Sequence, residues 1–380
     1  MIHDIALKEI QIHPVSVPLK QPIQTAYGRL THRNALILEL FSKDGTRVYS
    51  ECSALDDPGY HPETLNLAKQ CLETTLIPTV LNRPLTPRTL ARDLFDSAPN
   101  NPFAIAAIEM GVWALNAVSQ NVSLSSLLGS ETPGIQPKAR VASGYVLGLE
   151  TTERLAQETE NAEALGVHKL KFKVSPQTLS GTLSFIKDYD IFNRFKTVAL
   201  DANQQFDLET LEHLREVSRL PFSYIEEPFS RDFLIEEPRS RTQIKALFPF
   251  PIFLDEFVRS PSELQAALSL PACDGFIIKP AKLGGLQPAM DALALCQSRS
   301  KRSVLGGLFE TGIGRAYSLV FGALLTATSA PGIAPDLSPS SRYFSDDTAA
   351  PIELDSDGYF MVPDNAVFSD DSFRRLRRSS

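Results

Sequence analysis

A repeat of strand-like runs constrains the fold of this chain more than any other feature of its sequence. From residue 140 onward, short apolar and β-branched runs recur, each followed by a turn and in most cases by a segment with helical periodicity. Apolar runs that alternate with helices are typical of parallel strands buried on both faces of a sheet. The eight runs are RVASGYV at 140–146, KLKFKV at 169–174, TVALD at 197–201, SYIEE at 223–227, PIFLD at 251–255, GFIIK at 275–279, SVLGG at 303–307 and GIAPD at 332–336.

The spacing of the run ends predicts how the strands are arranged. Five successive run ends can be placed by a polar residue at or next to the end of the run, and these residues are 28, 25, 29 and 24 positions apart; they are Lys173, Asp201, Glu226, Asp255 and Lys279. One strand and helix of a (β/α)₈ barrel take about 30 residues. An open doubly wound sheet is the alternative, but its usual G-x-G-x-x-G turn follows none of the runs. We therefore predict an α/β fold with a TIM-type (β/α)₈ barrel over residues 136–345.

The segments before and after the repeat have a different character. Residues 1–135 alternate in places like an antiparallel sheet and then carry helical stretches from Pro62 and Pro102, which indicates an α+β capping domain. Residues 346–380 are mostly polar, and their apolar run YFMVP at 359–363 is expected to return and pair with the cap. The basic C-terminal end is expected to be a solvated tail.

Composition excludes several classes of function. Lys and Arg number 37 against 45 Asp and Glu, so a formal net charge of −8 provides no positive field to attract nucleic acid or an anionic membrane. Charged residues interrupt the N-terminus where a signal peptide needs an apolar run, and the apolar stretch at 316–325 is only about half of the roughly 20 residues in a membrane helix. We expect a cytoplasmic protein. Its four scattered cysteines are expected to be reduced.

Three consecutive run ends are acidic and predict a metal site. Asp201, Glu226 and Asp255 would meet at the mouth of the barrel, where the carboxyl ends of the strands converge. Like charges at that distance repel each other, and a divalent cation is the usual compensation. Oxygen ligands favour Mg²⁺, with Mn²⁺ as a substitute. The alternative is that each carboxylate caps the following helix.

Lysines flank the acidic run ends. Lys169, Lys171 and Lys173 alternate with apolar residues, so the three lysines share the inner face of their strand. Lys279 ends the sixth run, across the mouth from Lys173. For Lys169 we expect a partner at the closed end of the barrel. Two amines on opposite sides of a metal-bound substrate suit removal of a proton α to a carboxylate, because the cation and one amine stabilise the enediolate that forms.

Several motifs resemble one known family over almost the whole chain. They are HKLKFKV, LDANQQF, YIEEPF, FLDEF, IIKPAKLGG, GGLFETGIGRA at 306–316 and PDLSPSSRYFSDD, together with TAYG and ECSALDDPGYHPET before residue 65. The sequence resembles the muconate-lactonising branch of the enolase superfamily, and within it the subgroup of o-succinylbenzoate synthase and N-succinylamino acid racemase.

The resemblance implies a role for each motif residue. It implies Mg²⁺ held by the three run-end acids, with Lys173 as the acid/base of a syn dehydration and Lys279 as the group that stabilises the enediolate. It further implies neighbouring or substrate-facing roles for Lys171, Asn203, Tyr27, Gly306 and Gly307. The implied reaction converts the dicarboxylate 2-succinyl-6-hydroxy-2,4-cyclohexadiene-1-carboxylate to o-succinylbenzoate in menaquinone biosynthesis. The oligomeric state stays open, a homo-oligomer included.

The sequence departs from the family pattern at a few positions. Ser175 replaces a usual Gly, Phe257 a Ser and Ala114 an Asp. The pair Ala281-Lys282 replaces Gly-Arg, and in the family this arginine accompanies racemase activity. Lysine cannot reproduce a bidentate guanidinium contact, and dehydration needs one competent base whereas racemisation needs two. Dehydration is therefore favoured over N-succinylamino acid racemisation.

Three further alternatives remain open. A dipeptide epimerase would carry D-x-D at the eighth run, where this chain has Asp336-Leu337-Ser338. A muconate-type cycloisomerase would share the metal site and lysines, and only the cap loops around Tyr27 and Tyr60 would distinguish it. A non-catalytic barrel that binds a small acid would be expected to have lost a ligand or a lysine, and this chain has all five.

Overall fold

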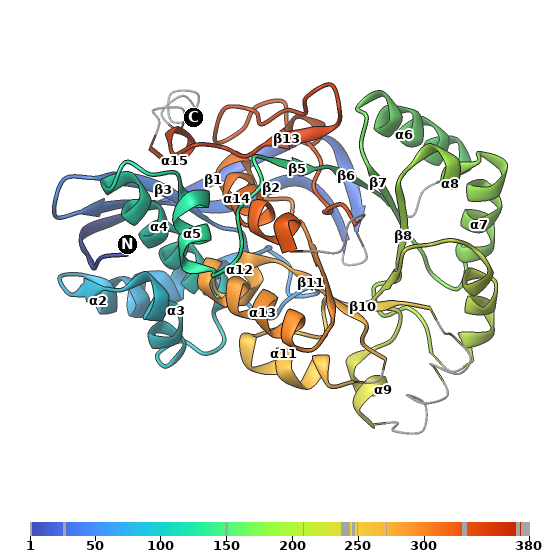
Figure 1. Ribbon diagram of the computed structural model, residues 1–380, viewed down its shortest axis with the longest axis horizontal. Coiled ribbons are helices and arrows are strands. Elements are labelled where there is room, and N and C mark those ends of the chain that lie inside the picture. The colour runs from blue at the N-terminus through green and yellow to red at the C-terminus, as the bar shows by residue number, and fades with distance from the viewer. Residues whose placement is uncertain are drawn as a thin grey trace.

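The computed structural model describes residues 2–25, 28–148, 151–207, 209–236, 244, 248, 250–270, 272–328, 333–369 and 373. Figure 1 shows an antiparallel sheet with its helices at one end of an elongated molecule and a curled parallel sheet with outer helices toward the other end. The architecture is therefore the predicted barrel with an α+β cap.

The cap is built on a four-stranded antiparallel sheet in the order β3-β2-β1-β4. Long strands β1 and β2 pair over most of their length, as the alternating sequence predicts. The elements of the cap are β1 (Ile5–Thr25), β2 (Gly28–Ser42), β3 (Arg47–Cys52), α1 (Leu65–Cys71), the π-helix η1 (Leu72–Leu76), α2 (Ile77–Val80), β4 (Pro84–Leu85), α3 (Pro87–Phe95), α4 (Pro102–Ser119) and α5 (Leu124–Glu131).

Helix α4 is the central helix of the cap. By length and composition it is the one described helix that could span a membrane, with a mean hydropathy of 1.3, but 89% of it is buried inside the molecule. Such burial on all sides is typical of a core helix in a soluble fold. This helix is longer than the apolar segment at 316–325.

The second sheet contains seven parallel strands in the order β12-β11-β10-β9-β8-β7-β6. They are β6 (Gly144–Leu147), β7 (Lys169–Lys173), β8 (Thr197–Asp201), β9 (Ile225–Glu226), β10 (Ile252–Leu254), β11 (Gly275–Ile278) and β12 (Arg302–Leu305). Each strand pairs with its sequence neighbour, as expected for a barrel of repeated βα units.

The eighth run is not a regular strand, contrary to the prediction. Its described part nevertheless occupies the eighth position of the ring, because the Asp336 N–H donates to the Leu305 carbonyl (2.9 Å) and the Gly144 N–H donates to the Leu337 carbonyl (2.8 Å). Pro335 has no N–H to contribute to a ladder, which is a physical reason for the irregular pairing. We call residues 333–338 the closing segment.

The first run is divided between two sheets. Strand β5 (Arg140–Ala142) pairs with β13 (Tyr359–Met361), and β6 begins only after Ser143, whose hydroxyl donates to the Gly358 carbonyl (2.7 Å). The YFMVP run therefore pairs with β5 rather than with the sheet of the cap. The C-terminal segment reaches the cap farther on, where the Phe373 ring lies 5.2 Å from the Tyr49 ring.

Helices follow most strands of the barrel. Between β8 and β9 the described residues form two short 3₁₀ turns in place of an α-helix. The remaining elements are α6 (Thr152–Ala164), α7 (Leu179–Asp188), α8 (Ile191–Arg194), η2 (Leu211–Arg215), η3 (Val217–Arg219), α9 (Arg231–Glu236), α11 (Pro261–Leu268), α12 (Pro280–Leu283), α13 (Leu286–Ser298), α14 (Gly312–Thr328), η4 (Ser340–Arg342) and α15 (Ala366–Ser369).

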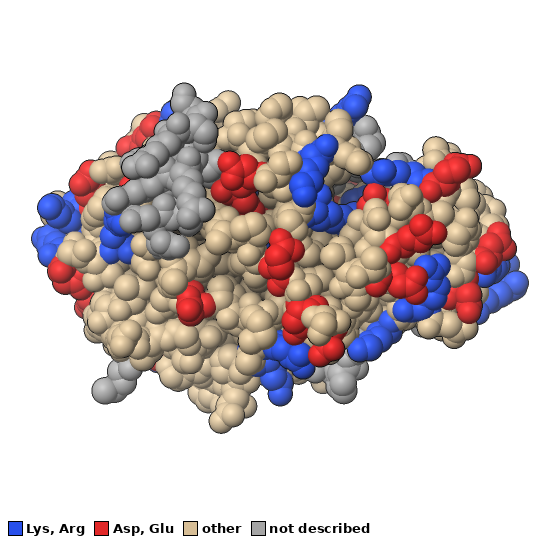
Figure 2. Space-filling model, turned by 90° about the horizontal axis from the view of Figure 1, so that it is seen from above, with Lys and Arg blue, Asp and Glu red and all other residues tan. Residues whose placement is uncertain are grey.

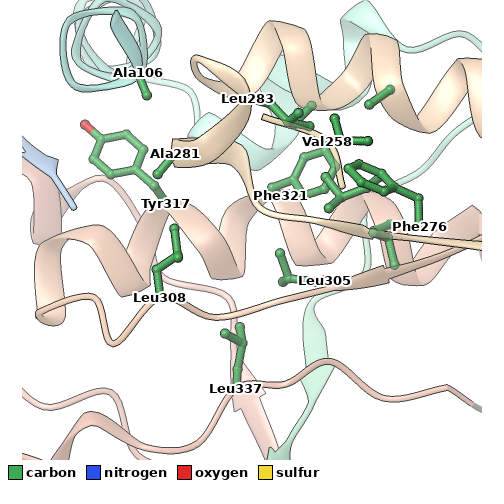
Figure 3. Packing of buried hydrophobic residues seen from close by; sticks show 14 of the residues in the cluster. Ala106, Val258, Phe276, Ala281, Leu283, Leu305, Leu308, Tyr317, Phe321 and Leu337 are labelled. Atoms are coloured by element: carbon green, nitrogen blue, oxygen red, sulfur yellow. The ribbon is translucent and has the colours of Figure 1, made fainter. Parts of the chain in front are cut away.

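One hydrophobic core joins the cap to the barrel. Figure 3 shows Ala106 of α4 near Tyr317 of α14 and Ala281 of α12, so helices of both parts pack together. In the same view Leu337 of the closing segment lies beneath Leu305 of β12. The Tyr317 hydroxyl also donates to the Tyr49 carbonyl of β3 (2.8 Å), which satisfies a polar group inside this interface.

The surface carries both signs of charge. On the face shown in Figure 2, acidic and basic side chains are interspersed among neutral ones.

The four cysteines are free thiols, and Cys52, Cys273 and Cys296 are buried.

Candidate active site

The strand order places the two lysine-ended strands on opposite sides of the barrel. Counting the closing segment as the eighth position, β7 and β11 are four positions apart in either direction around the ring. Lys173 ends β7 and Lys279 directly follows β11. The three strands between them end in Asp201 and Glu226 or are followed by Asp255. Parallel strands direct all these carboxyl ends to one edge of the barrel, which we call the rim.

On the β7 side, the lysines bind the carboxylates of neighbouring strands. The Lys171 ammonium lies 2.6 Å from Glu226 Oε2 and 3.8 Å from Asp201 Oδ2. Lys173 donates to Asp201 Oδ2 (3.2 Å) and to Asn203 Oδ1 (2.5 Å). The inner-face alternation predicted for this strand therefore brings Lys171 and Lys173 to Asp201, and Lys171 also to Glu226.

On the β11 side, a second cluster forms around Asp255. Lys279 donates to Asp255 Oδ2 (2.6 Å) and to the Tyr60 hydroxyl (2.9 Å). Lys282 donates to Asp255 Oδ1 (2.5 Å) and to the Asp255 carbonyl (2.6 Å). The Tyr60 hydroxyl lies 3.2 Å from Asp255 Oδ1, so a cap loop reaches the rim at this point.

Burial and charge together shift the titration of these groups. Burial raises the pKa of Glu226 to about 8, although Lys171 acts in the opposite direction. Burial alone would raise the pKa of Asp255, but the ammonium groups of Lys279 and Lys282 outweigh it and hold that pKa well below its usual range. Burial also disfavours the charged form of Lys279, yet Asp255 and Glu226 raise its pKa. At the rim, each buried carboxylate is therefore stabilised in its charged form by a nearby ammonium group, and each ammonium group by a nearby carboxylate.

The chemistry of the acidic side chains fits a divalent cation. Asp201, Glu226 and Asp255 are 4%, 1% and 1% exposed, offer only oxygen donors and follow one another around the rim. Among the residues that the structure describes, no three His, Cys, Asp or Glu side chains converge on one point as metal ligands, because ammonium groups lie against these carboxylates instead. The lysine ammonium groups thus lie where a bound cation would contact the carboxylates. Among divalent cations, Mg²⁺ prefers oxygen donors of this kind.

Two further acids at the rim were missed by the sequence analysis. Glu227 accepts the Asp255 N–H (2.6 Å), and Glu256 accepts the Asn203 amide (2.8 Å). Both follow a residue already singled out, so the doubled acids in Glu226-Glu227 and Asp255-Glu256 were the available signal. Glu227 therefore orients the backbone of Asp255, and Glu256 orients the side-chain amide of Asn203.

Four of the eight described non-glycine residues with a positive φ lie at the rim. Asn203, Gln204, Glu227 and Phe309 have φ angles of 40°, 64°, 39° and 54°, in the left-handed region that non-glycine residues rarely adopt. The Gln204 N–H donates to the Glu227 carbonyl (2.7 Å), which links two of these residues. Such strain is found preferentially at functional sites, where the surrounding structure holds it in place.

The other predicted site residues have different outcomes. Gly306 packs against the side chain of Lys279, since a Cβ at Gly306 would lie 2.4 Å from Lys279 Cε. A Cβ at Gly307 would lie 3.0 Å from the Asp336 carbonyl, so this glycine lies against the closing segment. Tyr27 lies outside the described residues. Lys169 has the partner expected for it, because its ammonium lies 2.7 Å from Asp336 Oδ1.

The departures from the family pattern have local explanations. The Ser175 hydroxyl accepts the Thr178 N–H (3.3 Å) in the turn after β7. The Phe257 ring lies 5.2 Å below the Arg231 guanidinium. Ala114 is fully buried in α4, where an aspartate would be costly without a partner.

Comparisons with known proteins agree with this geometry. Residues 154–366 match the family described as enolase C-terminal domain-like, and residues 7–129 match the mandelate racemase / muconate lactonizing enzyme N-terminal domain. The chain is 30% identical to o-succinylbenzoate synthase of Geobacillus stearothermophilus over 98% of this chain and 95% of that protein. It is 28% identical to N-succinylamino acid racemase of Thermus thermophilus over 94% and 92%.

A solved structure gives the same result for the fold. The structure of a probable mandelate racemase from Alicyclobacillus acidocaldarius matches with a TM-score of 0.83 and 31% identity, covering 98% of this chain and 97% of that one. Matches to both domains, along nearly the full length, accompany a rim with two opposed lysines and three intervening acids. The protein is an enzyme that belongs to the enolase superfamily.

Proposed function

We propose that the enzyme is an o-succinylbenzoate synthase, which dehydrates 2-succinyl-6-hydroxy-2,4-cyclohexadiene-1-carboxylate to o-succinylbenzoate. The observation that carries the proposal is the opposition of Lys173 and Lys279 across the rim, with Asp201, Glu226 and Asp255 on the strands between them. Relatives that bear this name, at 28–30% identity over most of the chain, support it. The resemblance would place the reaction in menaquinone biosynthesis.

The proposed mechanism assigns separate tasks to the two lysines. The neutral amine of Lys173 removes the proton α to the substrate carboxylate, and the resulting ammonium returns a proton to the hydroxyl that leaves on the same face. The Lys279 ammonium, on the opposite side, stabilises the negative charge that develops on the carboxylate. Mg²⁺ held by the three acids would act as a Lewis acid toward that carboxylate when bound.

Neighbouring residues would hold these groups in place. Asn203 accepts from Lys173 and donates to Glu256, so it fixes the direction of the Lys173 side chain. Tyr60 accepts from Lys279 and lies over the same ammonium, with 4.8 Å between Lys279 Nζ and the ring centroid. Fixed positions for acid and base groups reduce the entropy cost of reaching the transition state.

A racemase acting on N-succinyl amino acids is the second candidate, because a relative carries that name. Racemisation would require Lys279 to act as a base on the second face. In this chain Lys282 replaces the arginine that accompanies racemase activity in the family, and its ammonium binds Asp255. We therefore propose dehydration as the main reaction.

Dipeptide epimerisation has less support from the closing segment. Asp336 is turned inward to Lys169 and Lys171, and the Ser338 hydroxyl donates to the Gly144 carbonyl (2.8 Å). Neither residue is therefore available to hold the ammonium group of a dipeptide in the way that a D-x-D pair would.

The test follows aromatisation of the cyclohexadiene substrate by ultraviolet absorbance in the presence of Mg²⁺, with N-succinyl amino acids followed by polarimetry. We expect Lys173→Ala to lower kcat by at least about a thousandfold, since general base catalysis is lost together with the proton return. Lys187→Ala is the matched control, because Lys187 lies on the outer helix α7, where its ammonium forms an exposed ion pair with Glu216. Wild-type turnover in Lys173→Ala would refute the assigned base.

Metal removal provides an independent test of the acidic residues. Dialysis against EDTA should abolish turnover, and added Mg²⁺ or Mn²⁺ should restore it, because no other group at the rim supplies a divalent charge. Atomic absorption on the dialysed and restored enzyme measures the bound metal. Full turnover by metal-free enzyme would contradict the role proposed for Asp201, Glu226 and Asp255.

A further inference from the structure

A buried ion-pair network lies inside the barrel beneath the rim. Asp336 of the closing segment binds Lys169 through Oδ1 (2.7 Å) and Lys171 through Oδ2 (2.8 Å). Lys169 is fully buried and also donates to the Tyr224 hydroxyl (2.6 Å) and the Ala334 carbonyl (3.1 Å). One carboxylate therefore connects two lysines that stand on the same inner face of β7.

The network extends upward to the rim through Lys171 alone. This ammonium is shared between Asp336 on one side and Glu226 on the other, at 2.8 Å and 2.6 Å. Lys169 binds Asp336 together with two groups deeper in the barrel, the Tyr224 hydroxyl and the Ala334 carbonyl. Asp336 and Glu226 thus compete for one cation, so the strength of one ion pair affects the other.

We propose that Asp336 is a positioning residue that controls the affinity of the rim for a divalent cation by sharing the Lys171 ammonium with Glu226. Without the Asp336 carboxylate, the Lys171 ammonium would pair with Glu226 alone and would compete more strongly with a metal for that oxygen. Side chains that orient metal ligands in this indirect way commonly change metal affinity by about 10–100-fold when mutated. The inference rests on the proposed function only in taking Mg²⁺ as the cation.

The geometry predicts different effects on Mg²⁺ affinity when Asp336 loses its charge and when Lys169 loses its charge. Asp336→Asn keeps the shape of the side chain but removes its charge, so Mg²⁺ binding should weaken at least tenfold. Lys169→Met leaves Asp336 to Lys171 alone, which should strengthen that ion pair and weaken the hold of Lys171 on Glu226. Mg²⁺ should then bind as tightly as in the wild type or more tightly. Simple damage to the buried network would weaken binding in both variants.

The experiment measures the dissociation constant of Mg²⁺ alone by isothermal titration calorimetry on the full chain, with near-ultraviolet circular dichroism to verify folding. Lys171→Met and Lys171→Met/Asp336→Asn complete a double-mutant cycle. If Asp336 acts through Lys171, then the second substitution should change the dissociation constant less than threefold in the Lys171→Met background. Asp336→Glu, which restores the carboxylate, should remain within about threefold of the wild type.

Each outcome bears on the proposal. Equal weakening in Lys169→Met and Asp336→Asn, or a tenfold loss that persists in the Lys171→Met background, would overturn it, as would wild-type affinity in Asp336→Asn. If Asp336→Asn does not fold, Lys169→Met/Asp336→Asn takes its place, since neither of its two positions then holds an unpaired charge, and the same weakening is expected. A wild-type chain that binds no Mg²⁺ would instead refute the metal site of the proposed function.

Discussion

At the scale of single residues, Gly306 determines where a charged side chain can lie. A Cβ at this position would lie 2.4 Å from Lys279 Cε and 2.5 Å from Ile277 Cγ2, which is closer than packed atoms approach. The lysine stem therefore passes over a residue without a side chain on its way to Asp255. The ammonium position depends on a neighbour that has no polar group of its own.

We expect Gly306→Ala to displace Lys279 and to lower kcat by about 10–100-fold while the protein stays folded, since a shift of about 1 Å in a catalytic group has costs of this size. Steady-state kinetics with the cyclohexadiene substrate would measure the effect. Gly181→Ala is the matched control, because Gly181 is on the outer helix α7 and a Cβ there would meet no atom within 4 Å. Unchanged kcat in Gly306→Ala would show that Lys279 tolerates the displacement.

At the scale of elements, three helices begin against buried carboxylates that belong to other elements. Glu63 accepts the Phe103 and Ala104 N–H groups of α4 (2.7 and 3.0 Å). Glu109 accepts the N–H groups of Leu286 and Gln287 at the start of α13. In the same way Glu51 of β3 accepts the Gly314 N–H of α14 (2.9 Å). Carboxylates suit these positions, because the first N–H groups of a helix have no partner within the helix.

These carboxylates should make stability depend on pH. Burial raises the pKa of Glu63 to about 7 and that of Glu109 to about 8, from 4.5. The folded protein therefore keeps protons that the unfolded chain has already released, so the contribution to stability is complete below pH 4.5 and is lost as the pH rises through 7 and 8. We expect the free energy of unfolding to fall by on the order of 5 kcal/mol between pH 5.5 and 8.5, at about 1.4 kcal/mol for each pH unit over which one of these carboxyls is protonated only in the folded protein.

Urea unfolding at several pH values would measure this dependence. Glu109→Gln cannot ionise, so its curve should be flatter in the same interval. A wild-type stability that rises with pH across this interval would contradict the assignment of these two groups as its main cause.

The turn between α12 and α13 gives a second prediction for the elements. Gly285 has a φ of 128°, and a Cβ there would lie 2.0 Å from Glu109 Oε2. We expect Gly285→Ala to lower the free energy of unfolding by about 2 kcal/mol or more, through backbone strain together with overlap. Gly45→Ala is a matched control, because Gly45 also has a positive φ, of 90°, but has open space around it. Equal losses in the two variants would assign the whole effect to the backbone.

At the scale of the whole molecule, the cap and the barrel share buried contacts on several sides. Arg33 of β2 donates to the Phe309 carbonyl at the rim (3.0 Å), and Glu51 of β3 binds the start of α14. Helix α4 packs in the same hydrophobic core as α12 and α14. Unfolding of either part would expose these polar groups and the apolar surface between them.

We therefore expect the cap and the barrel to unfold in one transition. Trp113, the single tryptophan, lies buried in α4 and reports on the cap by fluorescence, whereas far-ultraviolet circular dichroism reports on all helices and strands. The two midpoints should coincide in the wild type and should fall together in Glu51→Ala, by several degrees. Loss of fluorescence well before loss of dichroism would indicate that the cap unfolds alone.

The sequence by itself determined the parts of this protein that depend on local patterns. Seven of eight predicted strand runs form the parallel sheet, and the alternation of Lys169, Lys171 and Lys173 placed all three on one face, because side-chain direction in a strand follows from position alone. Lys173, Asp201 and Glu226 lie at strand ends, as the ends of the apolar runs predicted.

The tertiary structure decided which residues meet. The pairing of Asp336 with two lysines, the contact of Tyr60 with Lys279, and the packing of Gly306 join residues far apart in the chain. No local pattern records such contacts, because they depend on how the barrel closes and how the cap packs on it. The closing segment shows this most clearly, since its place in the ring is set by hydrogen bonds to β12 and β6 rather than by a strand pattern of its own.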